Sequence, residues 1–182
     1  MPRRCVRSLL LPVLLCGLAL PAAAQTKAQA EPTTIFLVRH AEKATDDPRD
    51  PSLTPEGEAR AALLARMLAD AGIDAVYATD FRRTRGTAAP LAEALGHEVT
   101  LYAEQGPALA GRLLGAHRGQ QVLVAGHSNT VPMLLNALVG AARYEDLDDA
   151  EYDALFIVTV PAEGTPAVTL LRYGAEKQGP GH

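Results

Sequence analysis

The stretch TIFLVRH, residues 34–40, decides the fold class of this 182-residue chain. Its first five residues are a continuous β-branched and aromatic run, which is typical of a strand buried on both faces of a parallel sheet. The run ends at Arg39 and His40, so we expect this pair at the carboxyl end of the strand. A second run of this kind, QVLVA at residues 121–125, leads to His127. Because ligands bind beyond the carboxyl ends of strands in open α/β sheets, the sequence predicts two histidines facing one another in one crevice.

Helical patterns alternate with the expected strands. The segment Thr54-Pro55-Glu56 is a typical helix start. Thr54 suits the N-cap, Pro55 the first helical position and Glu56 the positive end of the helix dipole. We expect this helix to run to Ala71 and to end at Gly72.

The other expected elements complete an α/β pattern. The expected helices span residues 83–95, with Pro90 in the first turns, 107–117, and 130–139, with Ser128 and Asn129 as caps. The expected strands span residues 73–78, 99–102, 154–160 and 168–172. This alternation predicts an α/β fold, a three-layer α/β/α sandwich with a mostly parallel central sheet.

The first 24 residues have the order of a secretory signal peptide. Three arginines precede an apolar run from Leu9 to Leu20, and the small residues Ala22 to Ala24 follow. The run is too short for the roughly 20 residues that a helix needs to cross a bilayer. We therefore expect cleavage near Ala24, export to the periplasm or the medium, and no integral membrane association.

The remaining chain suits one domain. Residues 25–32 are expected to be a flexible leader, 33–175 the domain and 176–182 a flexible tail. Both cysteines, Cys5 and Cys16, lie in the signal peptide, so cysteine chemistry is excluded from the mature protein.

The charge of the mature protein narrows the class of partner. Losing three arginines with the signal peptide takes the formal charge from −4 to −7. An acidic protein disfavours nucleic acid and anionic membranes as partners. An anionic substrate must then be attracted by a local group of positive side chains.

Such a group lies next to the two histidines. Arg39 precedes His40, and a basic run that includes Arg83 follows the strand expected at residues 73–78. Arginine binds phosphoryl oxygens through two parallel donors and keeps its charge at every relevant pH. A single histidine at a strand end is more often structural, but the accompanying arginines favour a phosphoryl site.

Four blocks in chain order resemble those of the histidine phosphatase (phosphoglycerate-mutase-like) superfamily. FLVRHAEK resembles its Arg-His-Gly-Glu signature, LTPEG its helix start, TDFRRTRGTA its second arginine block and GHSNTV its second histidine block. The blocks cover about residues 34–140. The resemblance implies a phosphoglycerate-mutase-like fold and, with the signal peptide, a small exported phosphatase acting on a small phosphorylated substrate.

The resemblance also implies a role for each matched residue. His40 would attack phosphorus and become a phosphohistidine, which water then hydrolyses. Arg39, Arg83 and His127 would hold the oxygens of the transferred group, and Ser128 would add a phosphate contact. No metal ion or other cofactor is expected.

Some positions depart from the family pattern. Ala41 stands where many members have glycine, and Asp46 stands where mutase-like members often carry a phosphate-binding asparagine. An ionised aspartate cannot donate to phosphate, so Thr45 or Ser128 are candidates to replace that contact.

Two residues are candidates for the general acid that protonates the leaving alcohol. Glu104 has about the family separation from Arg83, and Glu42 lies two residues after the nucleophile. Glu42 and Lys43 could equally form a surface ion pair. The sequence leaves the choice between the two glutamates open.

Two other functions remain as alternatives to a phosphatase. A phosphomutase would return the phosphoryl group to substrate, and a noncatalytic module would only bind a phosphorylated ligand. The substrate and the oligomeric state are not indicated by any motif.

Overall fold

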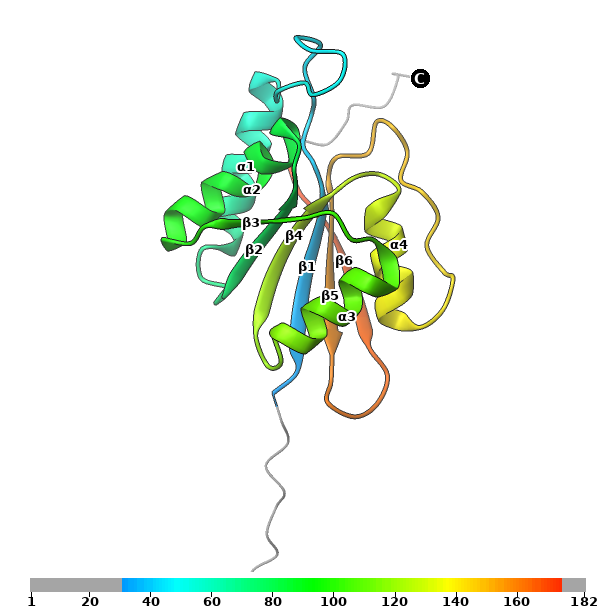
Figure 1. The fold of residues 1–182 in the computed structure, drawn as a ribbon. Helices are drawn as coiled ribbons and strands as arrows, with labels where there is room; N and C mark the ends of the chain where they lie inside the picture. The colour runs from blue at the N-terminus through cyan, green and yellow to red at the C-terminus, as the bar shows by residue number, and fades with distance from the viewer. Residues whose placement is uncertain (1–30, 175–182) are drawn as a thin grey trace, which may run out of the picture.

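The core strand predicted at the start of the domain lies at the centre of a layered α/β structure (Figure 1). The computed structural model describes residues 31–174. The strands are β1 (Thr33–Arg39), β2 (Ala75–Thr79), β3 (Val99–Tyr102), β4 (Gln121–Gly126), β5 (Ala154–Val160) and β6 (Ala167–Arg172). The helices are α1 (Pro55–Leu68), α2 (Arg82–Leu95), α3 (Gly106–Ala116) and α4 (Thr130–Val139).

The sheet is mixed and mostly parallel, as predicted. Its strand order is β3-β2-β4-β1-β5-β6. The pairs β3-β2, β2-β4 and β4-β1 are parallel, whereas β1-β5 and β5-β6 are antiparallel. The strands that carry the predicted histidines, β1 and β4, are direct neighbours in the middle of this sheet.

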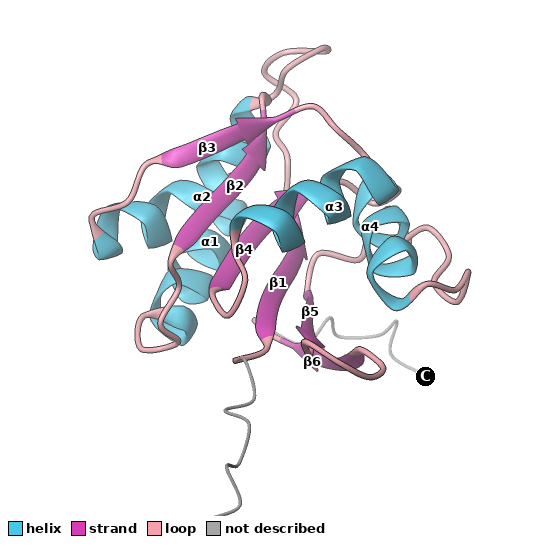
Figure 2. Cartoon of the chain, turned by 60° about the horizontal axis from the view of Figure 1, so that its bottom comes forward, coloured by secondary structure: helices cyan, strands magenta, loops and turns pink. Residues whose placement is uncertain are grey.

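Two hydrophobic cores cover the two faces of the sheet. Alternate side chains of β1 enter opposite cores, because successive residues of a strand point to opposite faces. Ile35 and Leu37 pack with α3 and α4, whereas Phe36 and Val38 pack with α1 and α2. Figure 2 shows the two helix pairs on opposite sides of the sheet. The predicted three-layer sandwich is therefore confirmed.

Helix α1 begins as predicted and ends earlier than predicted. The Thr54 side chain accepts a hydrogen bond from the amide of Gly57, and Pro55 is the first helical residue. The helix ends at Leu68 instead of Ala71. The Ala71 amide bonds to the carbonyl of Leu68, three residues back, so the last turn tightens before the chain reverses at Gly72.

Two local predictions about the other helices were wrong. Pro90 lies in the middle of α2, not in its first turns, and its missing N–H leaves out one bond of the helix. Asn129 stands at the N-cap of α4 in a helical backbone conformation and gives no side-chain cap. Instead, the Thr130 hydroxyl accepts from the amide of His127 at 2.8 Å. This bond fixes the turn between β4 and α4, and no side chain caps the first amides of the helix.

The antiparallel strand β6 forms one edge of the sheet. Most of its side chains are exposed, in contrast to the buried central strands. The predicted signal peptide and the tail at residues 176–182 lie outside the described residues, as does most of the predicted leader. Within residues 31–174, no helix is long and apolar enough to cross a membrane.

Candidate active site

The register of two neighbouring strands brings the predicted histidines together. Arg39 of β1 pairs with Gly126 of β4, so the residues that follow them, His40 and His127, lie opposite one another. The His40 amide donates to the carbonyl of Gly126 at 2.9 Å. The two imidazole rings meet edge to face, with centroids 5.5 Å apart. This register joins residues that are far apart in the sequence, so it is a property of the whole sheet.

The backbone holds His40 in a defined tautomer. Its Nδ1 lies 2.8 Å from the carbonyl oxygen of Ala41, which can only accept, so Nδ1 carries the proton and Nε2 keeps its lone pair. The side chain is 4% exposed, and burial lowers the pKa of His40 from 6.5 to about 3. The charges of nearby arginines act in the same direction. His40 is therefore neutral at neutral pH.

Arg39 is buried beneath a segment that we call the acidic strap, residues 143–153 (RYEDLDDAEYD). Its Nη1 donates to the carbonyls of Asp148 at 2.7 Å and Glu151 at 3.2 Å. Its guanidinium lies 4.4 Å from the ring centroid of Tyr152. Its Nε is buried without a hydrogen-bond partner. An unpaired buried donor is costly, which favours a site that an acceptor fills.

Arg83, in the first turn of α2, resembles Arg39 in having a side-chain donor without a hydrogen-bond partner. Its Nε is also buried without a partner, and its guanidinium stacks 4.4 Å from the ring centroid of Phe81. Burial lowers the pKa of Arg83, while the charge of Asp50 opposes that shift. The flanking arginines differ, because Arg82 pairs with Asp46 and Arg85 with Asp80. Within the basic run, Arg83 is the arginine with an unpaired buried donor.

A chain of hydroxyl groups orients His127. The Thr84 hydroxyl donates to backbone carbonyls, so in its 2.8 Å contact with Thr79 the Thr79 hydroxyl is the donor. The Thr79 oxygen must then accept from Nε2 of His127 at 2.9 Å. Burial lowers the pKa of His127 to about 4, with the charges of Arg83 and Arg39 acting in the same direction. This imidazole is also neutral, with its proton on Nε2.

Thr87 of α2 is a site residue that our sequence reasoning did not single out. Its hydroxyl accepts from the amide of Ala41 at 2.9 Å and donates to the carbonyl of Arg83 at 2.7 Å. Thr87 and Ala41 have no exposed surface. This bond joins the turn after His40 to the helix that carries Arg83. The Thr-Ala pair that ends the TDFRRTRGTA block was the available signal.

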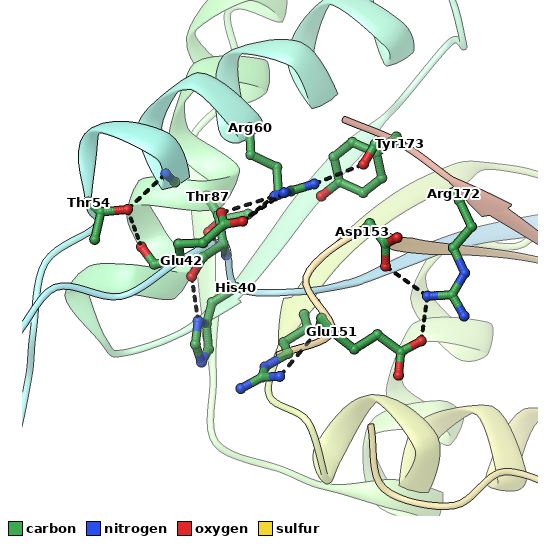
Figure 3. Close-up of polar contacts among 12 residues, drawn as sticks. His40, Glu42, Thr54, Arg60, Thr87, Glu151, Asp153, Arg172 and Tyr173 are labelled. Atoms are coloured by element: carbon green, nitrogen blue, oxygen red, sulfur yellow. Dashed lines mark hydrogen bonds and ion pairs between the residues drawn. The ribbon is translucent and has the colours of Figure 1, made fainter. Parts of the chain in front are cut away.

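Glu42, one candidate acid, points away from the two histidines. Its carboxylate accepts from Nε of Arg60 at 2.9 Å, and Nη2 of Arg60 lies 2.7 Å from it. Figure 3 shows the Glu42 carboxylate facing Arg60, while the ring of His40 points away from this ion pair. Arg60 also donates to the carbonyl of Tyr173. The structure therefore places Glu42 in a structural ion pair between α1 and the turn after His40.

Glu104, the other candidate acid, lies on the loop between β3 and α3. Its carboxylate is exposed and pairs with Arg112 at 2.9 Å. Backbone amides of Glu104 and Ala103, followed by Arg112, lower the pKa of this carboxyl. Such surroundings favour the ionised form, which is the opposite of what a proton donor needs.

Asp46 stands at the position of the family's phosphate-binding asparagine, and Thr45 and Ser128 were the candidates to replace its contact. The three residues lie in different surroundings. Asp46 accepts from the amide of Ser52 at 2.9 Å and from its hydroxyl at 2.8 Å, and these bonds lower the pKa of Asp46. Asp46 therefore organises its own loop, where Thr45 is exposed. Ser128 is half-buried directly after His127, and its carbonyl accepts from the amide of Leu147 at 3.0 Å.

The acidic strap adds two residues that no motif indicated. The ring of Tyr152 lies 6.1 Å from that of His40 between centroids. The carboxylate of Asp149 lies 3.8 Å from Nη2 of Arg39 and is fully exposed. Both reach the site because the strap folds back over β1, more than 100 residues later in the chain. Among residues 31–174, no group of three or more His, Cys, Asp or Glu residues is arranged to hold a metal ion.

The fold is that of the phosphoglycerate-mutase-like phosphatases. Three solved structures share it: the protein histidine phosphatase SixA complexed with tungstate (22% identity, TM-score 0.59, covering 76% of this chain and 96% of that one), a phosphoserine phosphatase from Entamoeba histolytica (16%, 0.61, 78% and 98%), and a mycobacterial glucosyl-3-phosphoglycerate phosphatase (14%, 0.62, 80% and 100%). At these identities the likeness establishes the fold alone.

A family model matches the part of the chain that runs from β1 to the start of α3. The model of the histidine phosphatase superfamily (branch 1) matches residues 35–106, which include His40 and Arg83. No curated protein matches the sequence. This part of the chain is therefore similar to the histidine phosphatase superfamily, and the fold agrees with that similarity.

Proposed function

We propose that this protein is a phosphatase that hydrolyses a small phosphomonoester through a phosphohistidine on His40. The observation that carries the proposal is a neutral imidazole, with Nε2 unprotonated, beside two arginines whose buried Nε atoms have no partner. Two unpaired cationic donors suit an oxyanion, and a neutral imidazole suits an attack on phosphorus. Tungstate, an oxyanion, is the ligand in the SixA structure named above.

The reaction has two balanced steps. Nε2 of His40 forms a bond to phosphorus as the bond from phosphorus to the leaving oxygen breaks, and the leaving oxygen takes up a proton. That proton comes from solvent. Water then attacks phosphorus and gives up a proton to solvent, the N–P bond breaks, and His40 returns to its neutral form as phosphate leaves. Splitting one displacement into two is the advantage of a covalent intermediate.

The other site residues stabilise the transferred group. Arg39 and Arg83 supply fork-shaped donors to its equatorial oxygens, where most catalysis of phosphoryl transfer arises. His127 contributes its remaining nitrogen, Nδ1, which becomes a donor when a bound dianion raises the pKa of this ring. Ser128 lies at the start of α4, where a helix N-terminus favours an anion. The charge stabilisation comes from arginine and histidine, so the proposed mechanism needs no metal.

A second candidate substrate is a phosphohistidine of another protein. The favouring observation is that Glu42 and Glu104, the expected acids, are held by Arg60 and Arg112. A departing imidazole is protonated readily because its pKa is near 6.5, whereas an alkoxide needs a strong positioned donor. The name of SixA as a protein histidine phosphatase is consistent with this substrate.

The test is turnover together with trapping of the phosphoenzyme from labelled substrates by a rapid quench in alkaline detergent. A phosphatase releases inorganic phosphate from p-nitrophenyl phosphate and forms an acid-labile phosphoenzyme. A phosphomutase would require a bisphosphate, and a noncatalytic binder would form no phosphoenzyme. Comparing phosphoserine with a phosphohistidine peptide separates the two candidate substrates.

We also propose that the protein is exported and cleaved near Ala24. The support is the arginine-rich start, the short apolar run and the Ala-x-Ala ending. Amino-terminal sequencing of protein from the native host tests it. A mature protein that begins at Met1 would contradict the proposal.

A further inference from the structure

We infer that Asp149 makes the site select substrates whose leaving group is positively charged, such as a phosphorylated amino alcohol, over those whose leaving group is anionic. The inference rests on the proposed phosphatase function and names the substrate class of the same site. A carboxylate stands at the rim of a site whose arginines are arranged for a dianion.

The place of Asp149 is set by the fold. The strap is anchored at both ends: Asn136 of α4 accepts from the amides of Arg143 and Tyr144, and Arg172 of β6 pairs with Glu151 and Asp153 (Figure 3). Between these anchors, Arg39 holds the carbonyls of Asp148 and Glu151. Asp149 is therefore presented at the site by a fixed segment.

The contact between Asp149 and Arg39 is open to a substrate. At 3.8 Å the carboxylate is beyond direct hydrogen-bond distance of Nη2, and its side chain is fully exposed. Arg39 itself is 4% exposed and keeps a buried, unpaired Nε. A phosphoryl group bound to Arg39 would thus lie close to the exposed carboxylate of Asp149.

A second carboxylate flanks the other arginine. Asp50, on the loop between β1 and α1, accepts from the amide of Arg82, and its charge acts on Arg83. Each of the two site arginines therefore has a carboxylate that acts on it, Asp149 on Arg39 and Asp50 on Arg83. Such a rim repels an additional anionic group on the substrate and attracts a cationic one. Substrates that carry their own cation offset the repulsion between the rim and the phosphoryl group.

The experiment compares kcat/KM for two small substrates matched in size, O-phosphoethanolamine and 2-phosphoglycolate, with p-nitrophenyl phosphate as the reference. We expect the wild-type protein to prefer phosphoethanolamine. Asp149→Asn should lower the ratio of kcat/KM for phosphoethanolamine to kcat/KM for 2-phosphoglycolate about tenfold. This is the effect expected when one charge acts at about 5 Å, in a solvated site, on two substrates of opposite charge. Asp149→Lys should shrink it further, and 1 M salt should weaken the wild-type preference.

The control is Asp70→Asn, which changes the net charge equally. Asp70 is exposed just beyond the carboxyl end of α1, about 21 Å of helix away from the site end. It should leave the ratio unchanged. Because Asp149 is fully exposed, its variants should fold, which urea unfolding checks.

The outcomes separate this inference from the proposed function. No turnover of p-nitrophenyl phosphate would refute the phosphatase itself. Turnover of that ester with no preference between the charged substrates, or a ratio unaffected by Asp149→Asn, would refute charge selection alone. An equal loss for both alkyl substrates in Asp149→Asn would make Asp149 a proton donor and would also overturn the inference.

Discussion

Glu42 and Arg60 form a nearly buried ion pair that holds the turn after His40 against α1, with the Glu42 carboxylate 2.7 Å from Nη2 of Arg60. Gly57 packs so closely here that a Cβ would collide with the carbonyl oxygen of Glu42. A residue two positions from the proposed nucleophile therefore has a structural role. Its proximity along the chain does not make it a proton donor.

Glu42→Gln should lower stability and leave acid catalysis unchanged. Arg60 would lose its charged partner, so we expect the free energy of unfolding to fall by about 1–3 kcal/mol. Glu104→Gln removes an exposed pair that solvent screens, so it should change the free energy of unfolding much less than Glu42→Gln. The measurement is urea unfolding together with the rate ratio of an alkyl to a nitrophenyl ester. A selective loss on the alkyl ester in either variant would restore that glutamate as the acid.

Thr87 should act as a positioning residue for His40. In Thr87→Val the buried amide of Ala41 loses its acceptor, which costs about 1–2 kcal/mol of stability. We expect kcat to fall about tenfold with little change in KM, because the turn that carries the nucleophile loosens. Thr87→Ser keeps the hydroxyl and should recover most of the rate. Equal kcat in Thr87→Val and wild type, measured well below both unfolding temperatures, would show a role in stability alone.

Mild acid should destabilise the protein through its two site histidines. Their folded pKa values, about 3 for His40 and about 4 for His127, lie below the unfolded value near 6.5. The unfolded chain therefore binds more protons below pH 6.5, and the free energy of unfolding falls as the pH falls. From pH 7 to pH 5 we expect a loss of about 4 kcal/mol, about 2 kcal/mol from each histidine.

Variants test the source of this pH dependence. His40→Gln and His127→Gln should each reduce the loss between pH 7 and pH 5 by about 2 kcal/mol. Stability between pH 7 and pH 8.5 should not depend on these histidines, because both are neutral there in either state. An unchanged slope in both variants would contradict the burial argument.

The two histidines should differ in the reaction although they face one another. His40→Ala removes the covalent route and should abolish turnover and the trapped phosphoenzyme. Arg83→Ala and His127→Ala each remove part of the charge stabilisation, and a measurable activity, reduced about 10²–10³-fold, should remain. The double variant His40→Ala/Arg83→Ala should be little worse than His40→Ala alone, because residues acting as a unit are not additive. A phosphoenzyme in His40→Ala would reassign the nucleophile.

Chelation should leave the rate essentially intact. In the proposed mechanism Arg39, Arg83 and His127 stabilise the charge that a divalent ion stabilises in many other phosphoryl-transfer enzymes. The measurement is turnover of p-nitrophenyl phosphate before and after EDTA treatment and dialysis. A large loss restored by adding a divalent ion would refute the mechanism.

Local sequence patterns were sufficient to predict much of the fold. The alternation of buried runs and helix starts predicted the three layers, the mostly parallel sheet and the order of the elements, because hydrophobic periodicity and capping act over a few residues. The same logic put His40 and His127 at the carboxyl ends of two strands. The errors were local, such as the expected caps of α4, Ser128 and Asn129, where the side-chain bond at this turn is instead made by Thr130.

Only the tertiary structure decided what surrounds those histidines. The pairing of Arg39 with Gly126, the capture of Glu42 by Arg60 and the return of Asp149 to Arg39 join residues 18 to 110 positions apart. Such contacts depend on strand register and on the paths of loops, for which short-range propensity carries no information. The sequence by itself determined which residue types end the strands, and packing of the whole chain decided which of the carboxylates reach them.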